Sequence, residues 1–512
     1  MSDMQMQSLI EYVLEGDSPM DRGTPSELQW LGEATDAQFE EFLQALLDTD
    51  LNSSHDPALA DVFRHVMYRL RPWDASNRRR LPPTSVPLVV AMYRKLGAAS
   101  SSRCHLLQIL AASAIPHELE EFTNLVIDDP PSDAPSALLA FGPLFQHTSY
   151  DVRRLFPKLL DALQHQVVAA SIIDLANFLF RHDLIAPHPG IARKEQLITL
   201  LGAVVQRLSR IEEDPTQFAT SPDEIAQQID DAISLAVALC DALALIGDRE
   251  AIGKLYQALE VRHRRLHTEA AAALARFGEE AGKNALVELV AEPVARLRVL
   301  AYAEELDLTE KLDEQFTTPV ARAEAELALW LAQPSQMGIP PTKMELIDSR
   351  LQHWPGYDEP VASFLFRFTY QLPASEYSNV GIVGPLTHAF GADLLDLPPD
   401  DIYAAFAGWH VEHEDIFEMD AAALTEAQRV EVTRLERKLR DHDFDAIQPA
   451  IFGMFLGDKV LVARAVCEGH SGIAVMDDHE PSWFPARNTS RPIGSYEACC
   501  IYKGRRLLRT FN

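Results

Sequence analysis

The chain has 512 residues, of which 47% are hydrophobic, and a formal net charge of -31. This length exceeds what one hydrophobic core usually spans, so we expect several domains or an extended repeat structure. The negative charge repels nucleic acid and anionic membranes, and it is more compatible with a basic protein or peptide as partner. A simpler explanation needs no partner, because the same charge keeps a large helical surface in solution.

The cysteine content and the apolar runs bear on where the protein is located. Five cysteines in a chain of this length do not form a disulfide framework. No uncharged apolar run reaches the ~18 residues that span a membrane, and the first residues lack the features of a secretion signal. We therefore expect a cytoplasmic protein, and no motif indicates a cofactor.

Residues 1–100 are predicted to form an N-terminal helical region. Thr35 and Gln38 have the spacing of a capping box, which favours a helix start at this point. A further helix is predicted over residues 86–96, and Gly97 provides a residue at which it can end.

Residues 101–330 are predicted to form a repeat region. The segments 242–248 (Ala-Leu-Ala-Leu-Ile-Gly-Asp) and 273–279 (Ala-Leu-Ala-Arg-Phe-Gly-Glu) are similar and lie 31 residues apart. Similarity at this period is typical of stacked helical hairpins. Ser221 before Pro222 is the predicted start of the helix that contains the first copy. A helix pair of this length cannot cover its own apolar face, so each pair needs neighbours on both sides.

The stretch from Leu245 to Leu255 (Leu-Ile-Gly-Asp-Arg-Glu-Ala-Ile-Gly-Lys-Leu) resembles the HEAT-like repeat of the phycobilin-lyase type. That repeat joins an Ala-rich helix, a Leu-Gly-Asp turn and a second helix with the pattern Ala-Ile-x-x-Leu. The match covers about residues 221–315. The resemblance implies an armadillo-like α-solenoid but leaves the activity open, because one such architecture serves many unrelated roles.

The last third of the chain has a different character. Residues 331–443 are predicted to form a divergent helical region, with helices over residues 385–395, 399–417 and 425–440. Residues 444–512 are predicted to form a small β-rich cap, with a strand over 459–467 and a hairpin over 496–511. The expected fold is mainly α: an α-solenoid of HEAT-like hairpins with a small C-terminal antiparallel β element.

His410, His413 and Glu414 form a candidate metal site. On a helix these three side chains share one face, so two imidazoles and a carboxylate could converge on one ion. Their order matches neither the zincin motif nor its inverted form. His413 also lies on an apolar stripe, where a packed histidine is expected, and a fourth ligand such as His388 or Asp393 would have to come from elsewhere.

Two further segments carry weaker signals. Residues 469–473 (Gly-His-Ser-Gly-Ile) lack the last glycine of a nucleophile elbow and precede a predicted strand, so we interpret them as a β-turn. Residues 487–512 hold six Lys and Arg against one Glu, and we expect them to dock on acidic helices of the same protein or to protect an edge strand, rather than to form an anion or nucleic-acid site.

The sequence favours a non-enzymatic interaction or scaffold protein that binds a protein or peptide partner in the solenoid groove. One alternative is a metal-dependent or other enzyme whose site lies within residues 380–480. A second alternative is a nucleic-acid-binding or DNA-repair HEAT-like protein, against which the net charge argues. The partner and the oligomeric state are left open.

Overall fold

A computed structural model describes residues 2–15, 26–70, 81–113, 115–146, 149–214, 221–373, 375–411, 416–418, 424–455, 457–487, 489 and 491–512. The chain divides into two compact units, residues 1–286 and 287–512, and each is described by itself. The boundary between them falls inside the region 101–330 that the sequence assigned to repeats. Within the described residues, no helix combines the length and apolarity that crossing a membrane requires.

The first unit is built from helices. Their bounds are α1 Ser2–Glu15, α2 Ser26–Glu33, α3 Asp36–Asp48, α4 Asp56–Leu70, α5 Val86–Leu96, α6 Cys104–Ser113, α7 Pro116–Asp128, α8 Ala134–Gln146, α9 Gln166–Arg181, α10 Lys194–Glu213, α11 Pro222–Ile246, α12 Ile252–Leu259 and α13 Arg264–Arg276. Helix α14, Glu280–Leu289, begins in this unit. Short 3-10 turns join several of them.

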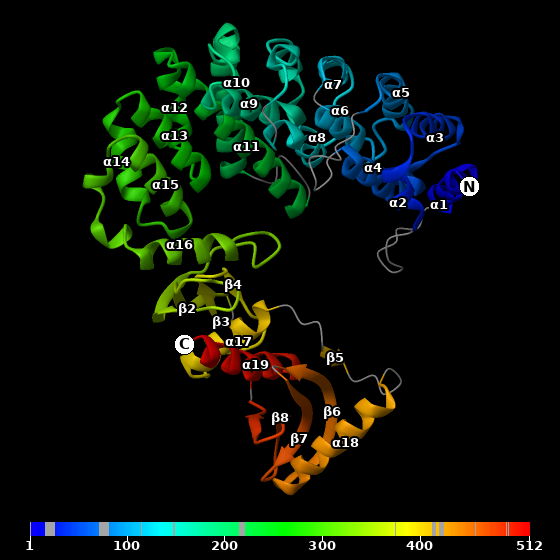
Figure 1. Cartoon of the computed structure of the whole chain (residues 1–512). Helices are drawn as coiled ribbons and strands as arrows, with labels where there is room; N and C mark the ends of the chain where they lie inside the picture. Colours follow the sequence, from blue (N-terminus) through cyan, green and yellow to red (C-terminus); the bar gives the residue numbers. More distant parts are fainter. Residues whose placement is uncertain are drawn as a thin grey trace. The chain divides into compact units, whose positions relative to one another are not determined.

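The helices of this unit contact one another in two rows. One row contains α2, α4, α6, α8, α9, α11 and α13, each in contact with the next. In the other row α3 contacts α5, α5 contacts α7, and α10 contacts α12. The pairs α6 with α7, α10 with α11 and α12 with α13 join the rows, and Figure 1 shows the helices succeeding one another in chain order.

Several helix ends lie where the local sequence predicts them. The Thr35 hydroxyl accepts the backbone N–H of Gln38 while the Gln38 side chain accepts that of Thr35, which completes the capping box. The Ser221 hydroxyl accepts the N–H of Glu224 at 3.2 Å and so caps α11. Gly247 ends α11 with a φ of +77°, in the left-handed region that favours glycine.

Buried polar side chains also join elements of this unit. Arg69 donates to the backbone carbonyl oxygens of Leu31, at 3.0 Å, and of Ala34. Arg103 donates to the carbonyl oxygen of Pro130 at 2.6 Å. Leu31 lies in the last turn of α2, while Ala34 and Pro130 lie just beyond the ends of α2 and α7, so these guanidinium groups join those helix ends to other parts of the unit.

The second unit alternates helices with two antiparallel sheets. Its elements are α15 Pro293–Glu305, α16 Pro319–Leu331, β1 Lys343–Gln352, β2 Val361–Gln371, β3 Glu376–Val383, β4 His388–Ala389, α17 Pro399–His410, β5 Ile416–Glu418, α18 Glu426–Asp441, β6 Phe444–Phe455, β7 Asp458–Cys467, β8 His470–Met476, β9 Pro481–Pro485 and α19 Ser495–Phe511. Strands β1 to β4 form the first sheet and β5 to β9 the second, each in chain order.

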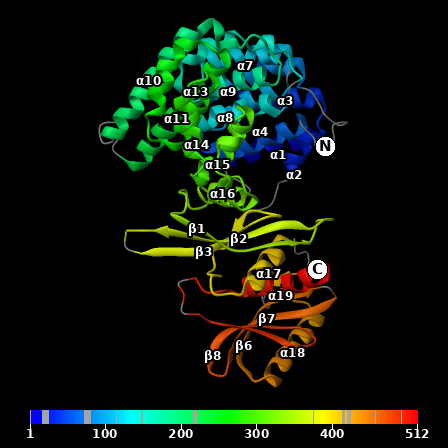
Figure 2. The same cartoon turned by 90° about the vertical axis from the view of Figure 1, so that its left-hand side faces the viewer.

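The elements of this unit lie in layers, which Figure 2 shows from the side. Leu327 of α16 packs on one face of the first sheet, against Phe366 and Phe368 of β2. Helices α17 and α19 share a core with both sheets, while Leu435 of α18 packs on the second sheet against Met476 of β8. The chain is therefore mainly helical with an antiparallel β element toward the C-terminus, as expected, although the element comprises two sheets.

Two expectations for the C-terminal third are wrong. Strands β1, β2 and β3 lie in the region 331–443 that was expected to be helical, and the helix expected over 385–395 is replaced by turns and β4. The predicted hairpin over 496–511 is the single helix α19. The sequence nevertheless carries the two-residue period of a strand here, because the aromatic side chains of β2 recur at every second position and pack toward α16: Phe364, Phe366, Phe368 and Tyr370.

Other expectations there are confirmed. The strand predicted over 459–467 is β7, Asp458–Cys467, and the helix predicted over 425–440 is α18, which begins with a capping box at Thr425. The helix predicted over 399–417 begins as expected but ends at His410. Glu468 and Gly469 have φ values of +50° and +80° at the turn between β7 and β8, so a turn is present as predicted but ends at Gly469, and residues 470–473 of the predicted turn belong to strand β8.

Candidate functional site

The predicted metal site is described only in part. His410 is the last residue of α17, and its ring lies 6.4 Å from that of Tyr357 between centroids. His413 and Glu414 lie outside the described residues, so their arrangement about His410 stays a prediction. Within the part of the chain that is described, no group of three or more His, Cys, Asp and Glu side chains is arranged to hold a metal ion.

The two residues considered as a fourth ligand have other contacts. The ring of His388 stacks on that of Trp409 with centroids 3.9 Å apart, and Phe390 and Phe406 pack around it. Burial lowers the pKa of His388 to about 4, so its imidazole is neutral at physiological pH. The carboxylate of Asp393 accepts the backbone N–H of Leu395 at 3.1 Å, as in a turn.

The basic C-terminal stretch pairs with acidic groups, as expected. Arg505 donates two hydrogen bonds to Asp401, at 2.7 and 2.8 Å. Arg506 forms an ion pair with Asp458. These contacts lie within the second unit and pair two of the six positive charges of this stretch with carboxylates of the same unit.

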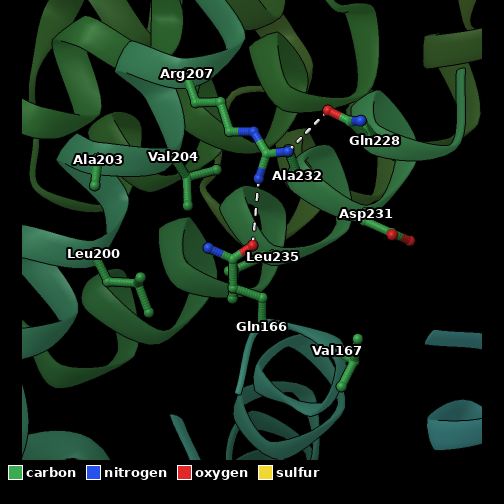
Figure 3. Close-up of a pocket in the computed structure, with 10 residues that line it drawn as sticks. All are labelled: Gln166, Val167, Leu200, Ala203, Val204, Arg207, Gln228, Asp231, Ala232 and Leu235. Carbon is green, nitrogen blue, oxygen red and sulfur yellow. Dashed lines mark hydrogen bonds between the residues drawn. The ribbon is translucent and has the colours of Figure 1, made fainter. Parts of the chain in front are cut away.

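A cavity of about 180 Å³ lies in the first unit between α9, α10 and α11 (Figure 3). Its lining is formed by Gln166, Val167, Leu200, Ala203, Val204, Arg207, Gln228, Asp231, Ala232 and Leu235. The lining is amphipathic, since aliphatic side chains from all three helices surround one guanidinium group. We refer to it as the Arg207 cavity.

Helical spacing explains how these residues come together. Leu200, Val204 and Arg207 are separated by one turn each along α10, so they lie on one face of that helix. Gln228 and Leu235 are separated by two turns on the facing side of α11. None of these residues was predicted from the sequence, although an arginine that continues an apolar stripe is a detectable signal.

Arg207 has neutral hydrogen-bond partners. Its Nη1 donates to Oε1 of Gln166 at 3.3 Å, and its Nη2 donates to Oε1 of Gln228 at 2.9 Å. Asp231 also lines the cavity, but Figure 3 shows its side chain directed away from Arg207, and it accepts a hydrogen bond from Gln227 at 2.8 Å. Among the described residues, no carboxylate forms an ion pair with Arg207.

A second group of charges lies on the neighbouring helices α9, α11 and α13. The carboxylate of Asp241 in α11 joins the three helices, because it pairs with Arg181 of α9 and, at 3.2 Å, with Arg276 of α13. Such a shared carboxylate fixes the lateral spacing of the helices. It also leaves one negative charge between two positive ones.

Asp174 of α9, in contrast to Asp241, lies near more negative than positive side chains. The side chain is exposed, yet the protein around it displaces enough water to raise the pKa of its carboxyl to about 6. The negative charges of Asp241 and Glu269 raise the pKa further, while Arg265 lowers it. The ionised form of Asp174 therefore lies in surroundings that favour an additional positive charge.

A polar hollow of about 390 Å³ lies on the first sheet of the second unit. Lys343 and Glu345 of β1, Arg367 of β2 and Glu376 of β3 line it, so charges of both signs are interspersed. Lys343 and Glu345 are 3.8 Å apart. This balanced, open surface favours no ligand of a particular charge.

Comparisons with known proteins give little further information. No protein-family model matches the chain, and no curated protein matches it. A solved structure entitled "Lipid-protein interactions in lipovitellin" is 12% identical, covers 89% of this chain and 50% of its own, and has a TM-score of 0.29. The chain thus spans about half the length of that lipovitellin chain, and at this TM-score the likeness carries no argument.

Proposed function

We propose that this chain is a non-enzymatic interaction protein. In this proposal the helices of the first unit form a HEAT-like α-solenoid, and the surface of α9, α11 and α13 around Asp174 binds a protein or peptide partner with cationic side chains. A cytoplasmic location belongs to the same proposal.

The repeated segments support the solenoid part of the proposal. The two copies end α11 and α13, and Gly247 and Gly278 follow at corresponding positions with φ values of +77° and +85°. Helices α11 and α13 contact each other directly, as consecutive repeats do. Two helices that end in similar local sequences thus lie next to each other, which supports the interpretation of these segments as consecutive repeats.

The environment of Asp174 is the observation that carries the choice of partner. A carboxylate that is accessible and also lies in surroundings that raise its pKa is stabilised by any cation that docks beside it. The net charge of -31 adds a long-range attraction for a basic partner and speeds its association.

Affinity capture from native extract with the full-length chain tests the proposal. We expect a stoichiometric partner that elutes as the salt concentration rises, because exposed charges are screened. Asp174→Lys is expected to abolish capture. Glu195→Lys, which makes the same charge change at an exposed position of α10, is expected to preserve it.

Two outcomes would contradict the proposal. One is the absence of any stoichiometric partner, and the other is equal capture by Asp174→Lys and by the wild-type chain. The enzyme and nucleic-acid alternatives stay predictions, and no observation on the described residues favours either of them.

A further inference from the structure

We infer that the Arg207 cavity binds a small monocarboxylate with an apolar body, whose carboxylate is received by Arg207. The inference does not depend on the proposed function, since the cavity and the surface around Asp174 use different side chains. It depends on the charge of the cavity, on its walls and on its size.

Arg207 differs from several other arginines of the first unit in its hydrogen-bond partners. Other arginines of the same unit lie against carboxylates: Arg103 against Asp129 at 3.1 Å, and Arg193 against Asp161 at 2.5 Å. Arg207 instead has the two glutamine oxygens as its hydrogen-bond partners. In a chain with a net charge of -31, a half-buried guanidinium beside neutral acceptors is a site for an anion from outside.

The hydrogen-bond geometry allows an anion to join. A guanidinium has five N–H donors, and the two bonds to glutamine engage one donor on each terminal nitrogen. The bond to Gln166 is long at 3.3 Å, so the glutamine can rotate away at little cost. A carboxylate would replace a neutral acceptor with a charged one and can bind the guanidinium through two parallel hydrogen bonds.

The walls favour an apolar body on the same ligand. Val167, Leu200, Val204 and Leu235 line the cavity from three helices, and Val204 lies beside the guanidinium in Figure 3. An alkyl chain would bury its surface against these side chains while its head group remains at Arg207. Asp231 on the rim disfavours ions with two negative charges, such as phosphate.

The volume of the Arg207 cavity limits the size of the ligand. A volume of about 180 Å³ lies below the roughly 300–1,000 Å³ of sites that hold drug-sized ligands. That space suits a short-chain organic acid rather than a nucleotide or a long-chain lipid.

Calorimetric titration of the full-length protein with acetate, butyrate and hexanoate tests the inference. We expect affinity to rise about threefold to fourfold for each added methylene until the cavity is full. Hexanol and hexylammonium, which lack the carboxylate, are expected to bind at least tenfold more weakly than hexanoate.

Substitutions in and near the Arg207 cavity test whether hexanoate binds there. Arg207→Met is expected to weaken hexanoate binding at least tenfold, while Arg210→Met, at an exposed position one turn further along α10, leaves it unchanged. Ala203→Phe keeps the charge but fills the cavity from an exposed position, so it should also abolish binding without needing Arg207 to be replaced.

The inference is overturned by any of three results. These are no saturable binding of hexanoate up to about 10 mM, hexanol binding as tightly as hexanoate, and Ala203→Phe binding hexanoate like the wild-type chain. Unfolding curves of the variants establish that a loss of binding does not arise from a loss of fold.

Discussion

Gly504 of α19 lies directly on the backbone of Ala404 in α17: a Cβ atom on Gly504 would be 1.7 Å from the Ala404 carbonyl oxygen. The contact is reciprocal one turn along, where a Cβ on Gly408 would be 2.0 Å from the carbonyl oxygen of Cys500. The two helices therefore meet backbone to backbone in the core that both sheets share. This approach is possible only because both positions lack a side chain.

Gly504→Ala is expected to lower the free energy of unfolding by about 3 kcal/mol, because the added methyl group has to push the two helices apart. Gly391→Ala serves as the matched control in the same unit, since its Cβ would meet Arg491 alone, at 3.9 Å. Denaturant unfolding of both variants measures the difference. Equal stabilities would show that α17 and α19 are not in this contact.

His188 is expected to make the first unit sensitive to acid. The histidine is 2% exposed, and burial lowers its pKa to about 4, although Asp241 acts in the opposite direction. Its Nδ1 accepts the N–H of Gly190 at 3.1 Å, so its Nε2 carries the proton and donates to Asn177 at 3.0 Å. The folded protein therefore holds the imidazole of His188 in its neutral form.

The direction of the pH dependence follows from the folded-state and unfolded-state pKa values of His188. The unfolded chain takes up a proton near pH 6.5, whereas the folded chain resists doing so until about pH 4, so stability is lost as pH falls through this window. The loss attributable to His188 is on the order of 3 kcal/mol. His188→Gln should be less stable at pH 7 but should lose less stability between pH 7 and pH 4. A pH dependence identical to that of the wild-type chain would contradict the assignment.

Asp174→Asn is expected to stabilise the isolated protein at neutral pH. The folded-state pKa of Asp174 is raised to about 6, so the folded protein holds its proton more tightly than the unfolded chain does. The cost of ionisation is absent below the unfolded value near 3.8 and complete above 6, where removing the charge is worth on the order of 1 kcal/mol after solvent screening.

Thermal unfolding at pH 7.5 and pH 3.5 measures this effect. The gain should appear at pH 7.5 and vanish at pH 3.5, and Glu195→Gln, at an exposed position, should give no such difference. The same Asp174→Asn variant should bind the proposed cationic partner more weakly. A carboxylate kept at a cost in stability is the pattern expected of a functional residue.

Arg296 is expected to be indispensable for the junction of α15 and α16. This guanidinium is 2% exposed and donates to the carbonyl oxygens of Val290, at 2.9 Å, and Ala321, at 2.8 Å. It also pairs with Glu324 at 2.5 Å. Arg296→Lys keeps the charge but cannot reach all of these acceptors, so it should cost about 2 to 3 kcal/mol.

The exposed Arg322 of α16 provides the control, and Arg322→Lys should change stability by no more than about 0.5 kcal/mol. Denaturant unfolding compares the two lysine variants. A cost at Arg296 no larger than that at Arg322 would show that the buried hydrogen bonds do not hold the junction.

Local sequence signals were sufficient for the helix ends. Thr35 and Ser221 cap helices, and Gly247 ends one, as their local sequences indicate, because each acts on backbone groups within a turn of itself. The prediction failed for β2 and α19. Helix α19 is buried against α17 and the second sheet, so its apolar positions are not confined to one stripe, whereas the two-residue period of the aromatic residues in β2 was present in the sequence and was not recognised.

The roles of Gly504 and Arg207 could not be predicted from the residues next to them in the sequence. In the sequence, Lys503 and Gly504 resemble a turn, but the glycine serves a contact with a helix about 100 residues earlier in the chain. The Arg207 cavity joins Gln166, Arg207 and Gln228 from three helices, and no spacing in the sequence connects the first with the last.

The sequence by itself thus determined a mainly helical chain and the start and end of several of its helices, since these depend on hydrogen bonds and periodicity within a few residues. Only the tertiary structure decided that the C-terminal third folds into layered sheets, that Gly504 meets Ala404, and that Arg207 lies between two glutamines. These features depend on which elements, far apart in the sequence, bury their apolar surfaces against each other. The packing of the whole unit decides this.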